Sequence, residues 1–387
     1  MDLRNISLKD KLSNRNAVPF QFGDALYATS PNWKGINIHM SDTYFRRVGK
    51  ATATRFFINN VTRDEADLAI NEGAIGCTQN PTYCWRVLTN SGDAAYAREK
   101  LLRILQEEDD DNEALVRLQR DLVEEIAKRF LPIYNKTGGK QGYVSIQGDP
   151  FKEDKESIIR FARFNCTAPN IIAKIPVIPS GLEAAGVLAA EGVPILLTEC
   201  FAVRQVIDAC EIYMEATKLL KDPAPMFFAL ITGIYDEYMH KLVQEQQIQV
   251  DRDALWQAGI SVAKKVHEIV AQRQYPCGFI GGGARGLHHF TEMVGANASI
   301  TINWNGTAEE LIKLDQPVVS RFLQPTPYLV VDELTEKLED YRKAYYINAI
   351  EPEEYKEYGP VALFRSIFED AWEKAVGMIA ALRKESL

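Results

Sequence analysis

The residue with the clearest chemical potential in this chain is a lysine inside a short apolar segment. Lys174 lies in residues 170–176 (NIIAKIP), with Pro169 before the segment and Pro176 at its end. Burial disfavours the charged form of a lysine and lowers its pKa, which makes the amine a usable nucleophile near neutral pH. A desolvated lysine amine forms Schiff bases with carbonyl substrates. The alternative is a side chain that extends from a strand end into solvent and stays charged.

Further polar residues stand at the ends of other apolar segments. They are Asn59, Asn80, Gln147, Thr198 and Arg285. Any one of them could be a structural side chain with satisfied hydrogen bonds. Together with Lys174 they predict one site, provided that these segments are parallel strands whose carboxyl ends meet at one rim.

Apolar segments of strand length recur along the chain, and amphipathic helical segments separate them. The eight predicted strands are residues 55–59, 74–77, 143–147, 171–175, 194–198, 226–231, 278–281 and 298–302. The intervening segments predict helices, two of them with capping-box patterns at Thr62 and Glu65 and at Ser180 and Glu183. Eight such units predict an α/β protein whose parallel sheet closes as a (β/α)₈ TIM barrel. A doubly wound open sheet is the alternative, but no G-x-G-x-x-G motif follows the first strand.

Three segments extend this barrel, which we expect to occupy residues 55–315. Residues 1–54 form a polar, loop-rich N-terminal extension that we expect to wrap the barrel. Residues 93–136 form a charged helical insertion, split by an acidic turn. Residues 316–387 are helical without further strands, and we expect them to pack on the barrel mouth or to form a contact in a homo-oligomer.

Composition limits the class of protein. The 387 residues are 46% hydrophobic and 25% charged, with a net charge of −9. This charge argues against binding to nucleic acid or to an anionic membrane. The six cysteines show no metal-ligand or disulfide spacing, so neither a zinc site nor a disulfide framework is expected. Without an apolar signal or membrane-spanning segment, the chain is expected to be cytoplasmic.

Three motifs, in this order, resemble the transaldolase family of Schiff-base aldolases. Residues 76–82 (GCTQNPT) are similar to the family signature T-x-N-P-[ST], and residues 144–149 (VSIQGD) to V-S-x-E-V-D. Residues 172–184 (IAKIPVIPSGLEA) are similar to the V-K-I-P-x-T-x-E-G-L stretch around the family's reactive lysine. The resemblance implies a cofactor-independent and metal-independent enzyme that acts on small sugars or sugar phosphates.

The resemblance also implies roles for individual residues. Lys174 would attack the keto group of a ketose, and Asn80, with Thr78 in the same motif, would bind substrate hydroxyls. Thr198 would help to hold the catalytic water, and Arg285 would bind phosphate beside Gly283 in a glycine-rich turn.

This chain departs from the family pattern at several of these positions. The first-strand aspartate is Asn59, or Asn60 if the alignment shifts by one, and an amide cannot act as a general acid or base. The third-strand glutamate is Gln147, which is similar to the fructose 6-phosphate aldolase branch of the family.

The proton-transfer and phosphate-binding groups also differ. Glu199 and Asp149 are candidate replacements for the missing acid, and Glu199 is an expected substrate contact, although it could instead be a solvated or salt-bridged carboxylate. The second phosphate-binding arginine aligns with Gly233, and the serine paired with the first aligns with Gly283. Half of the contacts expected to bind phosphate are therefore missing.

These observations predict a transferase that moves a dihydroxyacetone unit from a ketose to an aldehyde through a Schiff base on Lys174. Gln147 and Thr198 would position the water, and Asn59 would orient the substrate. One alternative is a lyase that releases dihydroxyacetone, similar to fructose 6-phosphate aldolase. Another is a catalytically impaired barrel that binds sugars or has a regulatory role.

Overall fold

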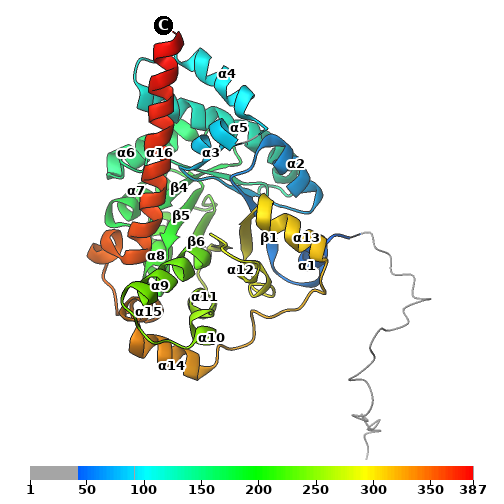
Figure 1. Ribbon diagram of the computed structural model, residues 1–387, viewed down its shortest axis with the longest axis vertical. Helices are drawn as coiled ribbons and strands as arrows, with labels where there is room; N and C mark the ends of the chain where they lie inside the picture. Colours follow the sequence, from blue (N-terminus) through cyan, green and yellow to red (C-terminus); the bar gives the residue numbers. More distant parts are fainter. Residues whose placement is uncertain (1–41, 91, 387) are drawn as a thin grey trace, which may run out of the picture. The chain divides into compact units, whose positions relative to one another are not determined.

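The chain folds into a closed barrel of eight parallel strands surrounded by helices, as the sequence predicts (Figure 1). The computed structural model describes residues 42–90 and 92–386. The strands are β1 (Arg55–Asn59), β2 (Cys77–Thr78), β3 (Val144–Gln147), β4 (Ile171–Pro176), β5 (Ile195–Cys200), β6 (Met226–Leu230), β7 (Gly278–Gly281) and β8 (Ser299–Asn303). Each strand pairs in parallel with the next, and β8 pairs with β1 to close the barrel.

The strands are short and almost entirely buried, because helices cover the outside of the barrel and side chains fill its inside. The helices of the first half are α1 (Tyr44–Ala51), α2 (Arg63–Asn71), α3 (Tyr83–Asn90), α4 (Ala94–Ile104), α5 (Asp111–Lys136), α6 (Lys155–Asn165), α7 (Pro179–Ala190) and α8 (Val203–Thr217). Those of the second half are α9 (Thr232–Glu245), α10 (Arg252–Leu255), α11 (Ala258–Gln272), α12 (His288–Thr291), α13 (Glu309–Leu314), α14 (Tyr328–Lys337), α15 (Glu339–Tyr345) and α16 (Gly359–Ser386), with a π-helical turn η1 (Trp304–Ala308) and a 3₁₀ helix η2 (Pro352–Glu357).

The two predicted capping boxes have different outcomes. At the start of α2, the Thr62 hydroxyl accepts from the Glu65 amide and the Glu65 carboxylate accepts from the Thr62 amide, so this prediction is confirmed. The prediction at Ser180 is wrong, because α7 begins at Pro179 after the N-cap residue Ile178. A proline suits the first helical turn, where its missing amide proton costs nothing. The Ser180 hydroxyl instead donates to the Glu153 carbonyl at 2.6 Å, which ties α7 to the loop after β3.

The segments around the barrel follow the predicted helical pattern where the structure describes them. The expected wrapping of residues 1–54 falls largely outside the described residues, but α1 within it is helical. The predicted insertion contains α4 and α5, separated by the acidic turn. The division of the chain at residues 54/55 and 315/316 stays a prediction.

The last helix, α16, crosses the molecule beside the carboxyl ends of the strands (Figure 1). It contacts α9 and η2, then β5, and then α3 and α5, so it bridges the two sides of the barrel. Its buried side chains include Phe364, Phe368 and Trp372. Among the helices of the described residues, none combines the length and apolar character that a bilayer crossing requires.

Candidate active site

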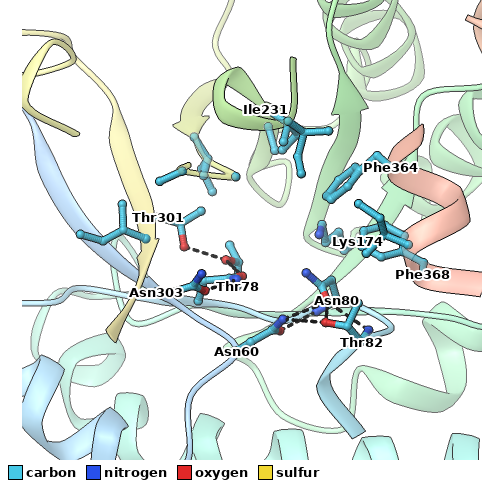
Figure 2. A pocket seen from close by; sticks show the side chains of 18 of the residues that line it. Asn60, Thr78, Asn80, Thr82, Lys174, Ile231, Thr301, Asn303, Phe364 and Phe368 are labelled. Atoms are coloured by element: carbon cyan, nitrogen blue, oxygen red, sulfur yellow. Dashed lines mark hydrogen bonds between the residues drawn. The ribbon is translucent and has the colours of Figure 1, made fainter. Parts of the chain in front are cut away.

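A cavity of about 240 Å³ opens at the carboxyl ends of the strands, and Lys174 forms part of its wall (Figure 2). Its polar lining comes from four asparagines, three threonines and three cations: Asn59, Asn60, Asn80, Asn303, Thr78, Thr82, Thr301, Lys174, Arg86 and Arg285. Its apolar lining comes from β6, β7, α9 and α16, and includes Ile231, Ile234, Phe364 and Phe368. Amides and hydroxyls opposite an amine suit a polyhydroxylated carbonyl compound.

Lys174 is a buried amine without an ion-pair partner. It lies on β4 in register with Gln147 of β3 and Leu196 of β5, and only 8% of its surface is exposed. Burial lowers the pKa of Lys174 to about 8, although the negative charge of Glu199 partly opposes this shift. Within residues 42–90 and 92–386, no carboxylate oxygen lies within 4.0 Å of its nitrogen. A substantial fraction of Lys174 is therefore neutral near physiological pH, as nucleophilic attack requires.

Two aromatic side chains of α16 cover this amine on the cavity side. The Lys174 nitrogen lies 5.8 Å from the centroid of the Phe368 ring, and Phe364 stands beside it (Figure 2). Phe368 is fully buried and Phe364 is 6% exposed. The C-terminal helix thus completes the environment of a lysine that lies about 200 residues earlier in the chain.

Removing the Phe368 ring should raise the pKa of Lys174. We expect Phe368→Ala to admit water and to move the pH midpoint of any Lys174-dependent reaction upward, from near 8 toward 10.5. The pH profile of covalent capture by Lys174 measures this shift. Phe130→Ala is the matched control, because Phe130 is equally buried but lies on α5 and is not among the cavity-lining residues. Both variants should lose about 3–5 kcal/mol of stability. Equal midpoints in the two variants would contradict the role of Phe368.

Asn59 and Thr78 belong to a hydrogen-bonded chain along one wall of the cavity. Asn59 Nδ2 donates to Asn303 Oδ1 at 3.0 Å, and Asn59 Oδ1 accepts from the Thr78 hydroxyl at 2.9 Å. The Thr78 and Thr301 hydroxyls are 2.7 Å apart. These contacts fix the orientation of each side chain, so this wall is preorganised for hydroxyl groups.

Asn60 brings Asn80 into a second cluster. Asn60 adopts a left-handed backbone conformation with a φ of 47°, which asparagine tolerates better than most residues. Its amide donates to Asn80 Oδ1 at 2.9 Å and to Thr82 Oγ1 at 3.1 Å. Both asparagines at the end of β1 therefore reach the cavity, and Asn60 is the one that contacts Asn80.

Gln147, Thr198 and Glu199 are buried on the strands that flank β4, and they are not among the residues that line the cavity. Glu199 is fully buried and accepts a hydrogen bond from Gln147 Nε2 at 2.9 Å. The alternative of a solvated or salt-bridged Glu199 is therefore wrong. Burial raises the pKa of Glu199 to about 7, although the hydrogen bond from Gln147 and the charge of Lys174 act in the opposite direction.

Asp149, the other candidate replacement for the missing acid, is held away from this group. It is buried, but its Oδ2 accepts from Asn112 at 2.9 Å and its Oδ1 from the Phe151 amide at 2.9 Å. Asp149 thus joins the loop after β3 to α5, whereas Glu199 faces Gln147.

Arg285 and Gly283 line the same cavity as Lys174, but Arg285 already has a carboxylate partner. Its guanidinium donates to Glu237, and its side chain is 40% exposed. Gly283 has a φ of 68°, and its carbonyl oxygen lies 2.1 Å from where a Cβ at Gly233 would stand. No side chain fits at Gly233 without moving this turn, so the missing second arginine is excluded by the backbone.

A buried histidine holds the glycine-rich turn in place. His289 Nδ1 accepts from the amides of Arg285 and Gly286, both at 3.2 Å, and His289 Nε2 lies 2.8 Å from Asp236 Oδ2. His288 lies near the same carboxylate, and its ring stacks on Trp256. In the described part of the chain, Asp236, His288 and His289 form the one group of potential metal ligands close enough to share a metal ion. Hydrogen bonding already explains the placement of His289 and Asp236.

Several residues of this site escaped the sequence analysis. Asn303 ends β8 as Asn59 ends β1, so the strand-end rule applied to Asn59 would also have found it. Thr301 alternates with Asn303 on the same strand. Phe364 and Phe368 gave no such signal, because their place over Lys174 depends on the path of the last helix.

Comparisons with known proteins agree with this geometry. The family model described as Transaldolase/Fructose-6-phosphate aldolase matches residues 56–348. A transaldolase of Acidothermus cellulolyticus is 32% identical over 172 residues, which cover 41% of this chain and 45% of that protein. A transaldolase of Trichodesmium erythraeum is 27% identical over 203 residues (45% of this chain, 50% of that protein), and one of Helicobacter pylori is 31% identical over 138 residues (34% and 42%).

The chain thus spans about half the length of the curated relatives that it matches. The family match, in contrast, runs from β1 through the strands that carry the cavity to the helices beyond β8. This chain therefore belongs to the transaldolase/fructose-6-phosphate aldolase family.

Proposed function

We propose that this protein is a transferase that passes a dihydroxyacetone unit from a ketose to an aldehyde through a Schiff base on Lys174. The observation that carries the proposal is a buried amine with a pKa of about 8 in the wall of a cavity lined by amides and hydroxyls. The names of the curated relatives support the same class of reaction. We also propose that it acts in the cytoplasm.

The reaction needs no group other than the amine to hold the electrons. The neutral Lys174 amine adds to the ketose carbonyl at C2, and loss of water gives an iminium. The C3–C4 bond then breaks as the C4 hydroxyl passes its proton to solvent water, because Asn59 cannot accept it, and the bonding electrons move into the iminium to form an enamine. The aldehyde product leaves, the enamine carbon attacks the acceptor aldehyde, and water then releases the new ketose from Lys174.

The cavity is arranged to orient the substrate in this sequence. We assign Asn59, Asn80 and Thr78 to substrate hydroxyls, because their hydrogen-bonded walls face Lys174 across the cavity (Figure 2). We assign Gln147 and Thr198 to the water that enters and leaves at C2, because Gln147 is in register with Lys174 on β3 and Thr198 lies on β5 in register with Pro176, two residues beyond Lys174. Gly283 and Arg285 would lie at the far end of the substrate.

The two arginines that line the cavity predict a weak preference for phosphate. Arg285 is bound to Glu237 and Arg86 to Glu65, so a phosphate must compete with a carboxylate for either guanidinium. We expect a phosphorylated ketose to be captured less than about tenfold better than its neutral counterpart, a difference below 1.4 kcal/mol. Glu237→Gln should free Arg285 and increase this ratio. Borohydride trapping with a panel of neutral, sulfonated and phosphorylated ketoses measures it.

The same experiment tests the proposed function. A mass increase confined to the peptide containing Lys174 would identify both the nucleophile and the donor. Sustained turnover only in the presence of an aldehyde acceptor would support the transferase. Release of free dihydroxyacetone without an acceptor would show a lyase instead, and the absence of any adduct across the panel would reduce the protein to a binding barrel.

A further inference from the structure

At the end of β5, the carboxylate of Glu199 reaches past β4, the strand of Lys174, to Gln147 at the end of β3. The pairing of β5 with β6 shifts register between Leu197 and Cys200, and Glu199, inside this irregularity, has a φ of 62°. A left-handed conformation is unfavourable for a glutamate, so packing must hold it there. The result is that both Thr198 and its neighbour Glu199 are completely buried, and the Glu199 carboxylate meets Gln147.

Three buried polar atoms around this carboxylate have no hydrogen-bond partner among the described residues. They are Glu199 Oε2, Gln147 Oε1 and Thr198 Oγ1. Burying an unpartnered polar atom is costly, and these three lie on the two strands that flank the strand of Lys174. The Glu199 and Gln147 oxygens can accept from the O–H groups of a water or a substrate, and the Thr198 hydroxyl can donate to an oxygen.

The charged groups around Glu199 come from β4, α16 and the loop after β3. Lys174 faces it from β4, and Arg365 and Glu369 face it from α16. Glu153, from the loop after β3, is coupled to it, and Arg365 Nε lies 3.7 Å from Glu153 Oε2 and 3.1 Å from Glu369 Oε1.

One of these carboxyls, Glu153, has a pKa that depends on the charge of Glu199. The negative charge of Glu199, after burial itself, raises the pKa of Glu153 to about 8, and the charge of Lys356 on η2 acts in the opposite direction. The hydrogen bond from neutral Gln147 opposes the effect of burial on the pKa of Glu199. The cluster therefore exchanges protons near neutral pH as a coupled set.

We propose that Glu199 is the residue that gives a proton to, and takes it back from, the oxygen at C2 while the Schiff base on Lys174 forms and breaks. When the carbinolamine loses water, the Glu199 carboxyl donates its proton to the leaving hydroxyl, and the C–O bond breaks. The iminium cation then faces the Glu199 carboxylate. In hydrolysis, that carboxylate accepts a proton from the attacking water as the C–O bond forms again. This step rests on the proposed function, and it assigns to β5 the carboxylate that β3 lacks at Gln147.

The test compares Glu199→Gln with the parent protein by the rate at which a ketose is trapped on Lys174. Glutamine keeps the size and hydrogen bonds of the side chain but cannot transfer a proton. We expect trapping and turnover to slow by about 10²–10⁴-fold, with the same final amount of adduct. The pH profile of kcat/KM should also lose its step near 7. A purely structural role would lower the rate without removing this step.

Two further variants keep the test decisive. Glu191→Gln removes a carboxylate that is paired with Arg163 on the surface, and it should leave the rate and pH profile as in the parent. Glu369→Gln removes a negative charge that raises the pKa of Glu199, and it should move the step of Glu199 to lower pH. This second shift is measurable even if Glu199→Gln fails to fold.

The inference and the proposed function fail in different ways. If Glu199→Gln is trapped within about threefold of the parental rate with an unchanged profile, Glu199 is not the proton carrier, but Lys174 remains the nucleophile. If the parent protein forms no adduct with any ketose, the proposed function itself is wrong.

Discussion

Lys174→Met should abolish covalent capture of ketoses and lower turnover by about three orders of magnitude or more, because methionine fills the same space without a nucleophile. The same substitution should stabilise the protein at pH 7. Burial lowers the pKa of Lys174 from 10.5 to about 8, so below pH 8 holding the charged amine in the folded state costs roughly 3 kcal/mol. We expect Lys174→Met to recover on the order of 1–3 kcal/mol of this free energy. The recovery is incomplete because Glu199 loses its positive neighbour.

The sign of this effect depends on pH. Between about 8 and 10.5, the unfolded chain holds a proton on Lys174 that the folded protein has lost, so the stability of the parent rises with pH. The advantage of Lys174→Met should therefore shrink across this range. Denaturant titrations of both proteins at pH 7 and pH 10 measure the difference, with Lys155→Met as a control at a partly exposed lysine. A methionine variant that turns over ketoses at the parental rate would refute the assignment.

Gly181→Ala should have the largest effect on stability among single-methyl changes near the site. A Cβ at Gly181, in α7, would stand 1.9 Å from the carbonyl oxygen of Pro176, at the end of β4. That oxygen belongs to the backbone two residues beyond Lys174, so it cannot move without moving the strand. We expect a loss of about 3 kcal/mol or more. Turnover should also fall, because the amine would be displaced.

Gly186→Ala is the matched control in the same helix. Its new methyl would meet only the Ile212 side chain, at 3.5 Å, which is an ordinary contact. Alanine favours helix over glycine by up to about 1 kcal/mol, so this variant should gain stability. Thermal unfolding of the two variants should show shifts of opposite sign. Shifts of equal size and direction would mean that Gly181 is not needed for the approach of α7 to β4.

The barrel could be predicted because its signals are local. Each buried strand is a continuous apolar run between turn residues, so the predicted and observed strands differ by only a few residues at their ends. Lys174 stood out because a charged residue breaks such a run. The capping box at Thr62 was also readable, since it needs only a pattern of four residues.

The parts that escaped depend on tertiary structure. The burial of Glu199 follows from an irregular pairing of β5 with β6, and no sequence period reports it. The pairing of Arg285 with Glu237 joins residues 48 positions apart. The roles of Gln147, Thr198 and the other site residues stay predictions until the variants are measured.

The position of α16 has a consequence for how the protein is made. Synthesis begins at the amino terminus, so every strand of the barrel is complete before residues 359–386 leave the ribosome. Until Phe364 and Phe368 arrive, the cavity side of Lys174 lacks its aromatic cover, and we expect water there to favour the protonated amine. The nascent barrel would therefore react little with cellular aldehydes and ketones. Lys174 would become nucleophilic only when α16 packs against the barrel.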